Sequence, residues 1–262
     1  MTSRPTALEA IGADPATAGL VLDFDGVLSP FVTDPATSVL PDRTASTLGR
    51  LARKLGLLAV ISGRPVSFLA ERVHVPGIPL LGSYGIERIR ADGRRETDPR
   101  AQAWLEKVGE ARRTLADRLA GSPGIRIERK SVSVAVHWRQ APDHDVAAAL
   151  VRQVTTEVAE ATGLRIEPGK MVLELRPPID VDKGSAIEAL LAAERPKTIA
   201  YAGDDLGDIP ALEAARAAGG YALVVDHGPE TDARLRALAD QTYAGTEAFA
   251  EWLAELADLI AA

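Results

Sequence analysis

The stretch LVLDFDGVL, residues 20–28, constrains the fold more than any other part of this sequence. Aliphatic residues lead directly into Asp23, Asp25 follows two positions later, and Gly26 allows a sharp turn. This run predicts a buried parallel strand that delivers two carboxylates at its carboxyl end, the edge where open α/β sheets bind ligands. An ordinary strand followed by an Asp-Gly turn would look the same, so the rest of the chain must decide.

The composition is that of a globular protein with one large or two modest domains. Of the 262 residues, 46% are hydrophobic and 26% are charged, which is enough to bury a core. There are no cysteines, which excludes disulfides, thiolate metal sites and cysteine nucleophiles. The net charge of −7 argues against nucleic acid as a partner. Any anion-binding site must therefore gather its own cations.

The sequence contains neither a membrane span nor a secretory signal. No apolar run approaches the ~18 residues that cross a bilayer, and the N-terminal residues lack an apolar signal segment. We therefore expect a cytoplasmic protein that has no membrane partner and is a monomer.

Apolar strands alternate with helices in the chain before residue 88 and again after residue 178. Helices are expected over residues 44–55 and 182–194, and another helix is expected to start near residue 65. A further helix is expected at the C-terminus, with Thr246 as a candidate N-cap. The expected further strands cover residues 57–65, 78–87, 197–208 and 221–228. This order predicts an α/β fold with a Rossmann-like parallel sheet wrapped by helices.

The middle part, residues 88–178, has the pattern of an inserted α+β domain. Helices are expected over about 99–119 and 143–161, and alternating strands over 125–139 and 165–177. In the first strand Ser133, His137 and Arg139 share a polar face, while valines form the other face, which is typical of a half-buried antiparallel sheet. We therefore predict a core domain of residues 1–87 and 179–262 and an inserted domain of residues 88–178.

Several strands of the predicted core end in polar residues. These are Asp23 and Asp25, Ser62, the group Asp204, Asp205 and Asp208, and Asp226. Carboxylates gathered at one sheet edge repel one another unless a cation lies among them. Their oxygen ligands suit Mg²⁺, and Lys183 at the head of a helix adds a positive charge.

This set of groups suits phosphoryl transfer. Asp23 would attack phosphorus and form an aspartyl-phosphate. Asp25 would protonate the leaving oxygen and then accept a proton from water. Mg²⁺, Lys183 and Ser62 would neutralise charge on the transferring group.

Each residue also has an ordinary structural interpretation. Ser62 could be a helix N-cap, Lys183 and His137 could be surface residues, and the pair of Asp204 and Asp205 could belong to a turn. The order of the motifs at the ends of predicted parallel strands favours the functional interpretation.

These residues resemble the motifs of the haloacid dehalogenase superfamily of phosphotransferases. The matching residues are Asp23-Phe24-Asp25-Gly26, Ser62, Lys183, and Gly203-Asp204-Asp205 with Asp208. The resemblance implies the haloacid dehalogenase fold, with residues 88–178 as a type-2 cap domain that closes over the substrate. It also implies that Asp23, Asp25, Asp204, Asp205 and Asp208 hold the metal ion.

Within that superfamily the chain resembles the trehalose-6-phosphate phosphatases. The matching segments are Leu22 to Pro30, Ser62-Gly63-Arg64, Gly82 to Glu87, Lys130 with His137 and Arg139, Gly169 to Pro177, Asp182 to Gly184, and Tyr201 to Asp208. The resemblance implies that the sugar is bound by Lys130, His137, Arg139, Lys170, Glu174 and Arg176. The substrate would be a phosphorylated sugar, and a separate synthase would supply it, because the chain carries no glycosyltransferase domain.

Three positions depart from the family pattern. Tyr84 stands where the family has His, Val27 replaces Thr, and the segment after Asp205 reads Leu-Gly-Asp-Ile-Pro. Tyr84 and Ile209 therefore bear on substrate preference, and another disaccharide or sugar phosphate stays an alternative substrate. A phospho-accepting receiver domain is an alternative of another class, but receivers are shorter and lack both the insertion and a residue equivalent to Asp25. A third alternative is an inactive sugar-binding relative, against which the intact Asp23, Asp25 and Asp204 argue.

Overall fold

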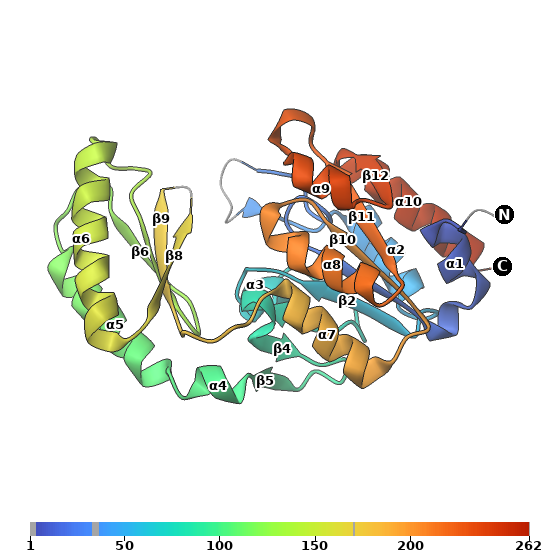
Figure 1. The fold of residues 1–262 in the computed structure, drawn as a ribbon, viewed down its shortest axis with the longest axis horizontal. Coiled ribbons are helices and arrows are strands. Elements are labelled where there is room, and N and C mark those ends of the chain that lie inside the picture. Colours follow the sequence, from blue (N-terminus) through green and yellow to red (C-terminus); the bar gives the residue numbers. More distant parts are fainter. Residues whose placement is uncertain (1–3, 33–36, 170, 262) are drawn as a thin grey trace. The chain divides into compact units, whose positions relative to one another are not determined.

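The computed structural model describes residues 4–32, 37–169 and 171–261 (Figure 1). The chain divides into two compact units, one of residues 1–96 with 181–262 and one of residues 97–180. The first unit extends nine residues past the predicted core boundary at residue 87 because two short strands continue its sheet.

Within the described residues, the first unit is built on an eight-stranded sheet with the order β12-β11-β10-β1-β2-β3-β4-β5. The strands are β1 (Ala18–Asp23), β2 (Leu57–Ile61), β3 (Leu80–Gly82), β4 (Glu87–Ile89), β5 (Arg95–Thr97), β10 (Thr198–Gly203), β11 (Tyr221–Asp226) and β12 (Gln241–Ala244). Neighbours from β12 to β3 are parallel, and β4 is antiparallel to β3. The parallel α/β prediction is confirmed.

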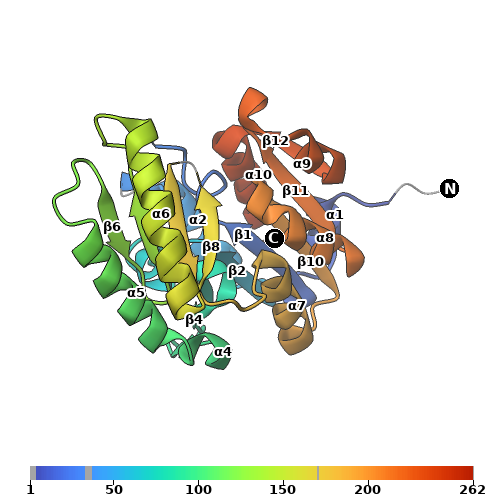
Figure 2. The ribbon, with the colours of Figure 1, turned by 60° about the vertical axis from the view of Figure 1, so that its left-hand side comes forward.

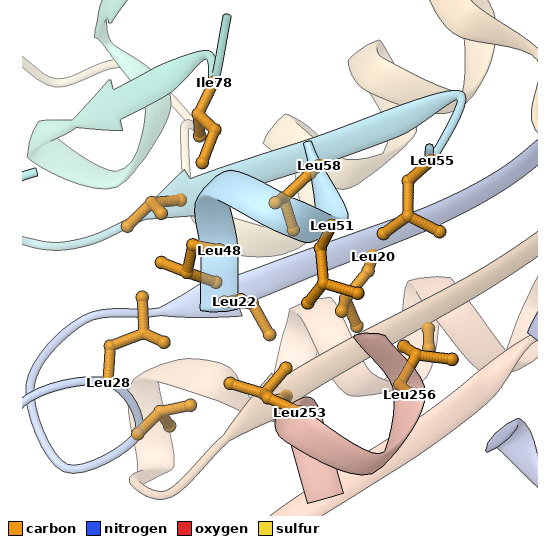
Figure 3. Packing of buried hydrophobic residues seen from close by; sticks show 14 of the residues in the cluster. Leu20, Leu22, Leu28, Leu48, Leu51, Leu55, Leu58, Ile78, Leu253 and Leu256 are labelled. Atoms are coloured by element: carbon orange, nitrogen blue, oxygen red, sulfur yellow. The ribbon is translucent and has the colours of Figure 1, made fainter. Parts of the chain in front are cut away.

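Strand β1 lies between β10 and β2 and is buried along its whole length. Leu20 and Leu22 pack on one face against the helices α2 (Asp42–Leu51) and α10 (Gly245–Leu259), as Figure 3 shows. Val21 points to the other face and packs with residues of the helix α7 (Lys183–Glu194) and of β10. Burial of each such side chain contributes roughly 1.5–3 kcal/mol, so the strand that ends at Asp23 is firmly fixed.

Helices cover both faces of this sheet (Figure 1). They are α1 (Ala7–Ala13), α2 (Asp42–Leu51), α3 (Val66–Ala70), α7 (Lys183–Glu194), α8 (Ile209–Ala217), α9 (Ala233–Leu238) and α10 (Gly245–Leu259). Throughout the part of the chain that the structure describes, every helix is too short or too polar to cross a bilayer.

The prediction that Thr246 caps the last helix is wrong. Helix α10 begins at Gly245, and the residue at its N-cap position is Ala244, which makes no side-chain cap. The Thr246 hydroxyl lies in the first turn and donates a 3.1 Å hydrogen bond to the Gly26 carbonyl oxygen. Thr246 thus lies near the start of the helix, as predicted, but its hydroxyl bonds to Gly26, far away in the sequence, and not to the helix backbone.

The second unit, over its described residues, is a four-stranded antiparallel sheet with the order β6-β7-β9-β8. Its strands are β6 (Arg126–Arg129), β7 (Val134–His137), β8 (Arg165–Gly169) and β9 (Val172–Arg176), and its helices are α4 (Pro99–Gln102), α5 (Leu105–Arg118) and α6 (His144–Thr162). Helices α5 and α6 pack on one face of the sheet (Figure 2). The opposite face carries the polar residues.

The stretches 125–139 and 165–177, each predicted as one strand, are β-hairpins. The first hairpin turns between Lys130 and Ser133, where the Lys130 amide donates to the Ser133 carbonyl over 3.2 Å. That turn contains no Gly, Pro, Asn or Asp, and its serines, Ser131 and Ser133, fit the polar face of a single alternating strand, so the turn was not predicted. The predicted faces are nevertheless correct, because Val134 and Val136 are buried in the unit's core.

Candidate active site

Asp23, at the end of β1, is buried against Lys183. The Lys183 ammonium nitrogen Nζ lies 2.8 Å from Asp23 Oδ1 and 2.6 Å from Asp208 Oδ1. All three side chains are at most 5% exposed. Lys183 therefore neutralises two buried carboxylates that follow different strands, and it is not the solvated surface lysine of the alternative interpretation.

The start of helix α7 explains how a lysine comes to lie there. Asp182 caps the helix, because its side chain accepts from the Ser185 amide over 2.8 Å. Lys183 is then the first helical residue, a position where the helix dipole disfavours a cation. Gly184 lets this turn approach α8, since a Cβ there would lie 2.7 Å from the Pro210 carbonyl oxygen. The carboxylates compensate for the unfavourable helix position.

Asp208 is fully buried and accepts hydrogen bonds on both oxygens. Oδ1 accepts from Lys183 and from the Tyr201 hydroxyl over 2.5 Å. Oδ2 accepts from the amides of Asp204 and Asp205 over 2.9 and 3.1 Å. Asp208 therefore fixes Lys183 and the backbone that carries Asp204. No separate role was predicted for Tyr201, although this residue lies on β10, the strand that ends at Gly203.

Asp204 packs directly on the turn after β1. Gly26 has a φ of +79°, and a Cβ on it would lie 2.1 Å from Asp204 Oδ2, so only glycine fits there. One carboxylate oxygen from each of Asp23, Asp204 and Asp208 lies within 4.8 Å of the others. Asp205 is exposed and accepts from the Gly207 amide over 2.9 Å.

The electrostatics of this cluster show an excess of negative charge. Burial and the charge of Asp208 raise the pKa of Asp23 well above its usual value. Burial and the charge of Asp23 raise the pKa of Asp204 to about 9. Burial alone would lower the pKa of Lys183, but Asp208 and Asp23 raise it well above its usual value. One ammonium thus faces three buried carboxylates, and their oxygens form a donor set that fits a divalent metal ion.

Asp25 lies at the edge of the cluster and is paired with Arg64. The Arg64 guanidinium donates to both carboxylate oxygens, Nε to Oδ2 over 2.9 Å and Nη2 to Oδ1 over 3.1 Å. The Ser38 hydroxyl also donates to Oδ1 over 3.0 Å. Neither partner had a predicted role, although Arg64 belongs to the quoted Ser-Gly-Arg motif.

Ser62 follows β2 and is 2% exposed. Its hydroxyl oxygen accepts from the Arg64 amide over 3.1 Å, so it stabilises the turn. The same hydroxyl keeps its proton available for another acceptor. Tyr84, the departure from the family pattern, packs next to this turn, since a Cβ on Gly63 would lie 2.8 Å from its ring.

In the second unit, Lys130 and Glu174 meet on the polar face of the sheet. Lys130 Nζ lies 2.5 Å from Glu174 Oε2, and the Ser133 hydroxyl donates to Oε1 over 2.5 Å. Both charged side chains are mostly buried, at 14% and 16% exposed. The two predicted residues are therefore brought together from β9 and the turn before β7.

His137 instead pairs with Glu128, a residue that the sequence analysis did not select. The ring Nε2 lies 2.7 Å from Glu128 Oε2, and this contact lowers the pKa of the Glu128 carboxyl. Arg139 lies beyond the end of β7 and is exposed, and Arg176 ends β9 and is buried. The predicted residue Lys170 lies outside the described residues.

A model of the trehalose-phosphatase family matches residues 21–240. The chain belongs to the trehalose-phosphatase family. The match spans both units, and it agrees with the predicted resemblance and with the haloacid dehalogenase fold that the family shares.

Individual relatives of this family member are similar over much of its length. It is 34% identical over 247 residues to the trehalose-phosphate phosphatase of Mycobacterium marinum, and the aligned region covers 91% of this chain and 62% of the relative. It is 38% identical over 222 residues to an uncharacterised glycosyl hydrolase of Mycobacterium tuberculosis, and the aligned region covers 81% of this chain and 16% of the relative. The chain thus spans less than two thirds of these relatives.

A solved structure of a trehalose-6-phosphate phosphatase related protein has the same fold. It superimposes with a TM-score of 0.75 at 25% identity, over 92% of this chain and 98% of that one. The two proteins therefore share their fold over nearly the whole of this chain. A receiver domain, the alternative of another class, does not account for this match.

Proposed function

We infer that this trehalose-phosphatase family member is a Mg²⁺-dependent phosphatase that hydrolyses trehalose 6-phosphate to trehalose and phosphate. The observation that carries the inference is the buried cluster of Asp23, Asp204 and Asp208 around Lys183. Such a cluster is costly to fold unless cationic groups and a charged substrate complete it. The similarity to the trehalose-phosphate phosphatase of Mycobacterium marinum supports the choice of substrate.

In the proposed reaction, Asp23 attacks phosphorus and forms an aspartyl-phosphate while the sugar oxygen leaves. Asp25 gives that oxygen a proton. Asp25 then accepts a proton from the water molecule that hydrolyses the aspartyl-phosphate, which releases phosphate and restores Asp23. The fixed position of β1 supports the role of Asp23, because nucleophilic attack needs a carboxylate held in line with the leaving oxygen.

The charge that develops on the phosphoryl group would be neutralised by Lys183, by the Ser62 hydroxyl and by the metal ion. Asp23 and Asp204 are the carboxylates best placed to hold Mg²⁺, and Asp25, Asp205 and Asp208 stay predicted ligands. Because the oxygens of Asp208 already accept four hydrogen bonds, we assign it the role of fixing Lys183 and the Asp204 backbone. When bound, Mg²⁺ would supply the electrostatic stabilisation that one lysine cannot.

Sugar recognition is proposed for the polar sheet face of the second unit, which would act as the cap domain. The proposed sugar-binding residues are Lys130, His137, Arg139, Lys170, Glu174 and Arg176. Paired charges such as Lys130 and Glu174 hold each other in place and keep further donors and acceptors for hydroxyl groups. Another disaccharide phosphate remains the alternative substrate, and a separate synthase remains the proposed source of the substrate.

The proposed function is tested by measuring phosphate release from trehalose 6-phosphate, sucrose 6-phosphate and glucose 6-phosphate, with Mg²⁺ and with excess EDTA. We expect kcat/KM for trehalose 6-phosphate to exceed the others by about tenfold or more, since one lost set of hydrogen bonds is worth roughly 1–3 kcal/mol. EDTA should abolish release, and excess Mg²⁺ should restore it. Full activity in EDTA would disprove the metal role, and no release from any of the three would favour an inactive binding protein.

Glu174→Ala separates sugar recognition from chemistry at phosphorus. We expect kcat/KM to fall about 10- to 100-fold for trehalose 6-phosphate, because charge-assisted hydrogen bonds to the sugar are lost. The value for p-nitrophenyl phosphate, which has no sugar, should stay within about threefold. The matched control is Glu160→Ala, which removes an exposed carboxylate on α6, the helix that packs on the opposite face of the sheet. Equal losses on both substrates would remove Glu174 from the sugar site.

A further inference from the structure

Two residues from the last quarter of the chain hold the turn that follows β1. The Gly26 carbonyl oxygen lies 2.9 Å from His227 Nε2 and accepts from the Thr246 hydroxyl over 3.1 Å. His227 follows β11, and Thr246 lies in the first turn of α10. A carbonyl oxygen has two lone pairs, so these two donors saturate it.

The contact also defines the state of the His227 ring. A carbonyl oxygen only accepts, so Nε2 must carry the proton. The His227 amide donates to the Thr231 hydroxyl oxygen over 2.8 Å, and the ring packs against Phe31 with 4.4 Å between ring centroids. The backbone hydrogen bond and the ring contact with Phe31 therefore hold the imidazole in one place. A residue that positions another group needs such support.

The turn that is held in this way lies between two groups of the site. Gly26 is the neighbour of Asp25, and a Cβ on Gly26 would lie 2.1 Å from Asp204 Oδ2. His227 Nε2 also lies 3.8 Å from Asp204 Oδ2. Rotation of the Gly26 peptide would therefore move Asp25 and open space beside Asp204.

We propose that His227 and Thr246 are positioning residues that fix the Gly26 carbonyl and thereby hold Asp25 and Asp204 in their reactive places. The proposal rests on the proposed function for its catalytic consequence, but the anchoring itself is independent of activity. The two donors share one acceptor, so each is expected to compensate in part for loss of the other.

The kinetic test uses Thr246→Val, Thr246→Ser, His227→Phe and the double variant Thr246→Val with His227→Phe. Valine removes the hydroxyl at equal size, serine keeps it, and phenylalanine keeps a ring against Phe31. We expect each donor-removing single variant to lower kcat on trehalose 6-phosphate about three- to tenfold, with KM within about twofold. The double variant should lose more than the product of the two single losses, and Thr246→Ser should stay within about twofold of the parent.

The structural test observes the Gly26 carbonyl directly. Gly26-Val27 is the only Gly-Val pair in the sequence. Labelling glycine with ¹³C at the carbonyl and valine with ¹⁵N therefore gives one carbonyl-to-amide NMR correlation, which belongs to this peptide. Because Thr246→Val would create a second Gly-Val pair with Gly245, the NMR test uses Thr246→Ala in its place. Thr246→Ala and His227→Phe should each shift the Gly26 carbonyl resonance, and Thr246→Ser should not. Matched controls are Thr242→Ala and His74→Phe, which replace exposed residues.

The outcomes are distinct. An unmoved carbonyl resonance in both donor-removing variants overturns the anchoring. A shifted resonance with unchanged kcat overturns the positioning role, as does a loss of kcat in Thr246→Ser equal to that in Thr246→Val. If the parent protein releases no phosphate from any sugar phosphate while the resonance shifts, the proposed function fails and the anchoring stands.

Discussion

Asp23→Asn is expected to abolish phosphate release, by a factor on the order of 10⁴ or more, as for loss of a covalent nucleophile. The fold should persist, because asparagine has nearly the same size and β1 is held by apolar packing on both faces. Without metal, the melting temperature should stay equal or rise. Burial and the Asp208 charge raise the pKa of Asp23, which means that its ionised form destabilises the folded state.

The measurement is phosphate release together with thermal unfolding in EDTA. Asp180→Asn is the control, because its side chain is fully exposed in a contact with Arg165, and it should change neither quantity. Retained turnover in Asp23→Asn would show that the nucleophile is another residue. A lowered melting temperature would show that Asp23 is a net stabilising partner of Lys183.

Lys183→Met is expected to abolish activity and also to destabilise the protein strongly. Methionine has a similar length but leaves Asp23 and Asp208 buried without their shared cation. Removing one partner of a buried ion pair costs about 3–5 kcal/mol, and each kcal/mol shifts Tm by roughly 2–4 °C in a protein of this size. The loss should be smaller at pH 5 than at pH 8, because burial and the Asp208 charge raise the pKa of Asp23, so that protonation at low pH removes part of the uncompensated carboxylate charge.

Lys197→Met is the matched control for that prediction. Lys197 forms an exposed ion pair with Asp14 at 3.1 Å, with its side chain 73% exposed. Such pairs contribute about 0–1 kcal/mol, so its Tm should change little. Similar Tm values for the two variants would show that Lys183 is not needed to neutralise the cluster.

The sequence could predict a parallel sheet and the edge of that sheet where the carboxylates lie. Apolar runs that end at Asp23 and Asp204 indicate buried parallel strands, and the ends of such strands must meet at one edge. Alternation likewise placed the valines of β7 on the buried face. These features follow from periodicity, which is a local property of the chain.

What could not be predicted is which polar groups pair with one another. Arg64 with Asp25, Glu128 with His137, and Tyr201 with Asp208 join groups that no period or spacing relates. These pairings depend on side-chain directions in the assembled sheets. The first hairpin of the second unit escaped prediction for a local reason, since its turn lacks Gly, Pro, Asn and Asp and its two serines fit the polar face of one continuous strand.

The central place of β1 also determines when this site can form as the chain is made. Ala18 pairs with Thr198, so the strand that carries Asp23 waits for one neighbour until some 180 further residues have been synthesised. Closing so long a loop carries an entropic cost that grows with the logarithm of its length. The second unit, residues 97–180, has a hydrophobic core of its own and can fold first. By folding early it shortens the free chain between β2 and β10. A nascent chain that ends before β10 contains Asp23 and Lys183 but neither Asp204 nor Asp208.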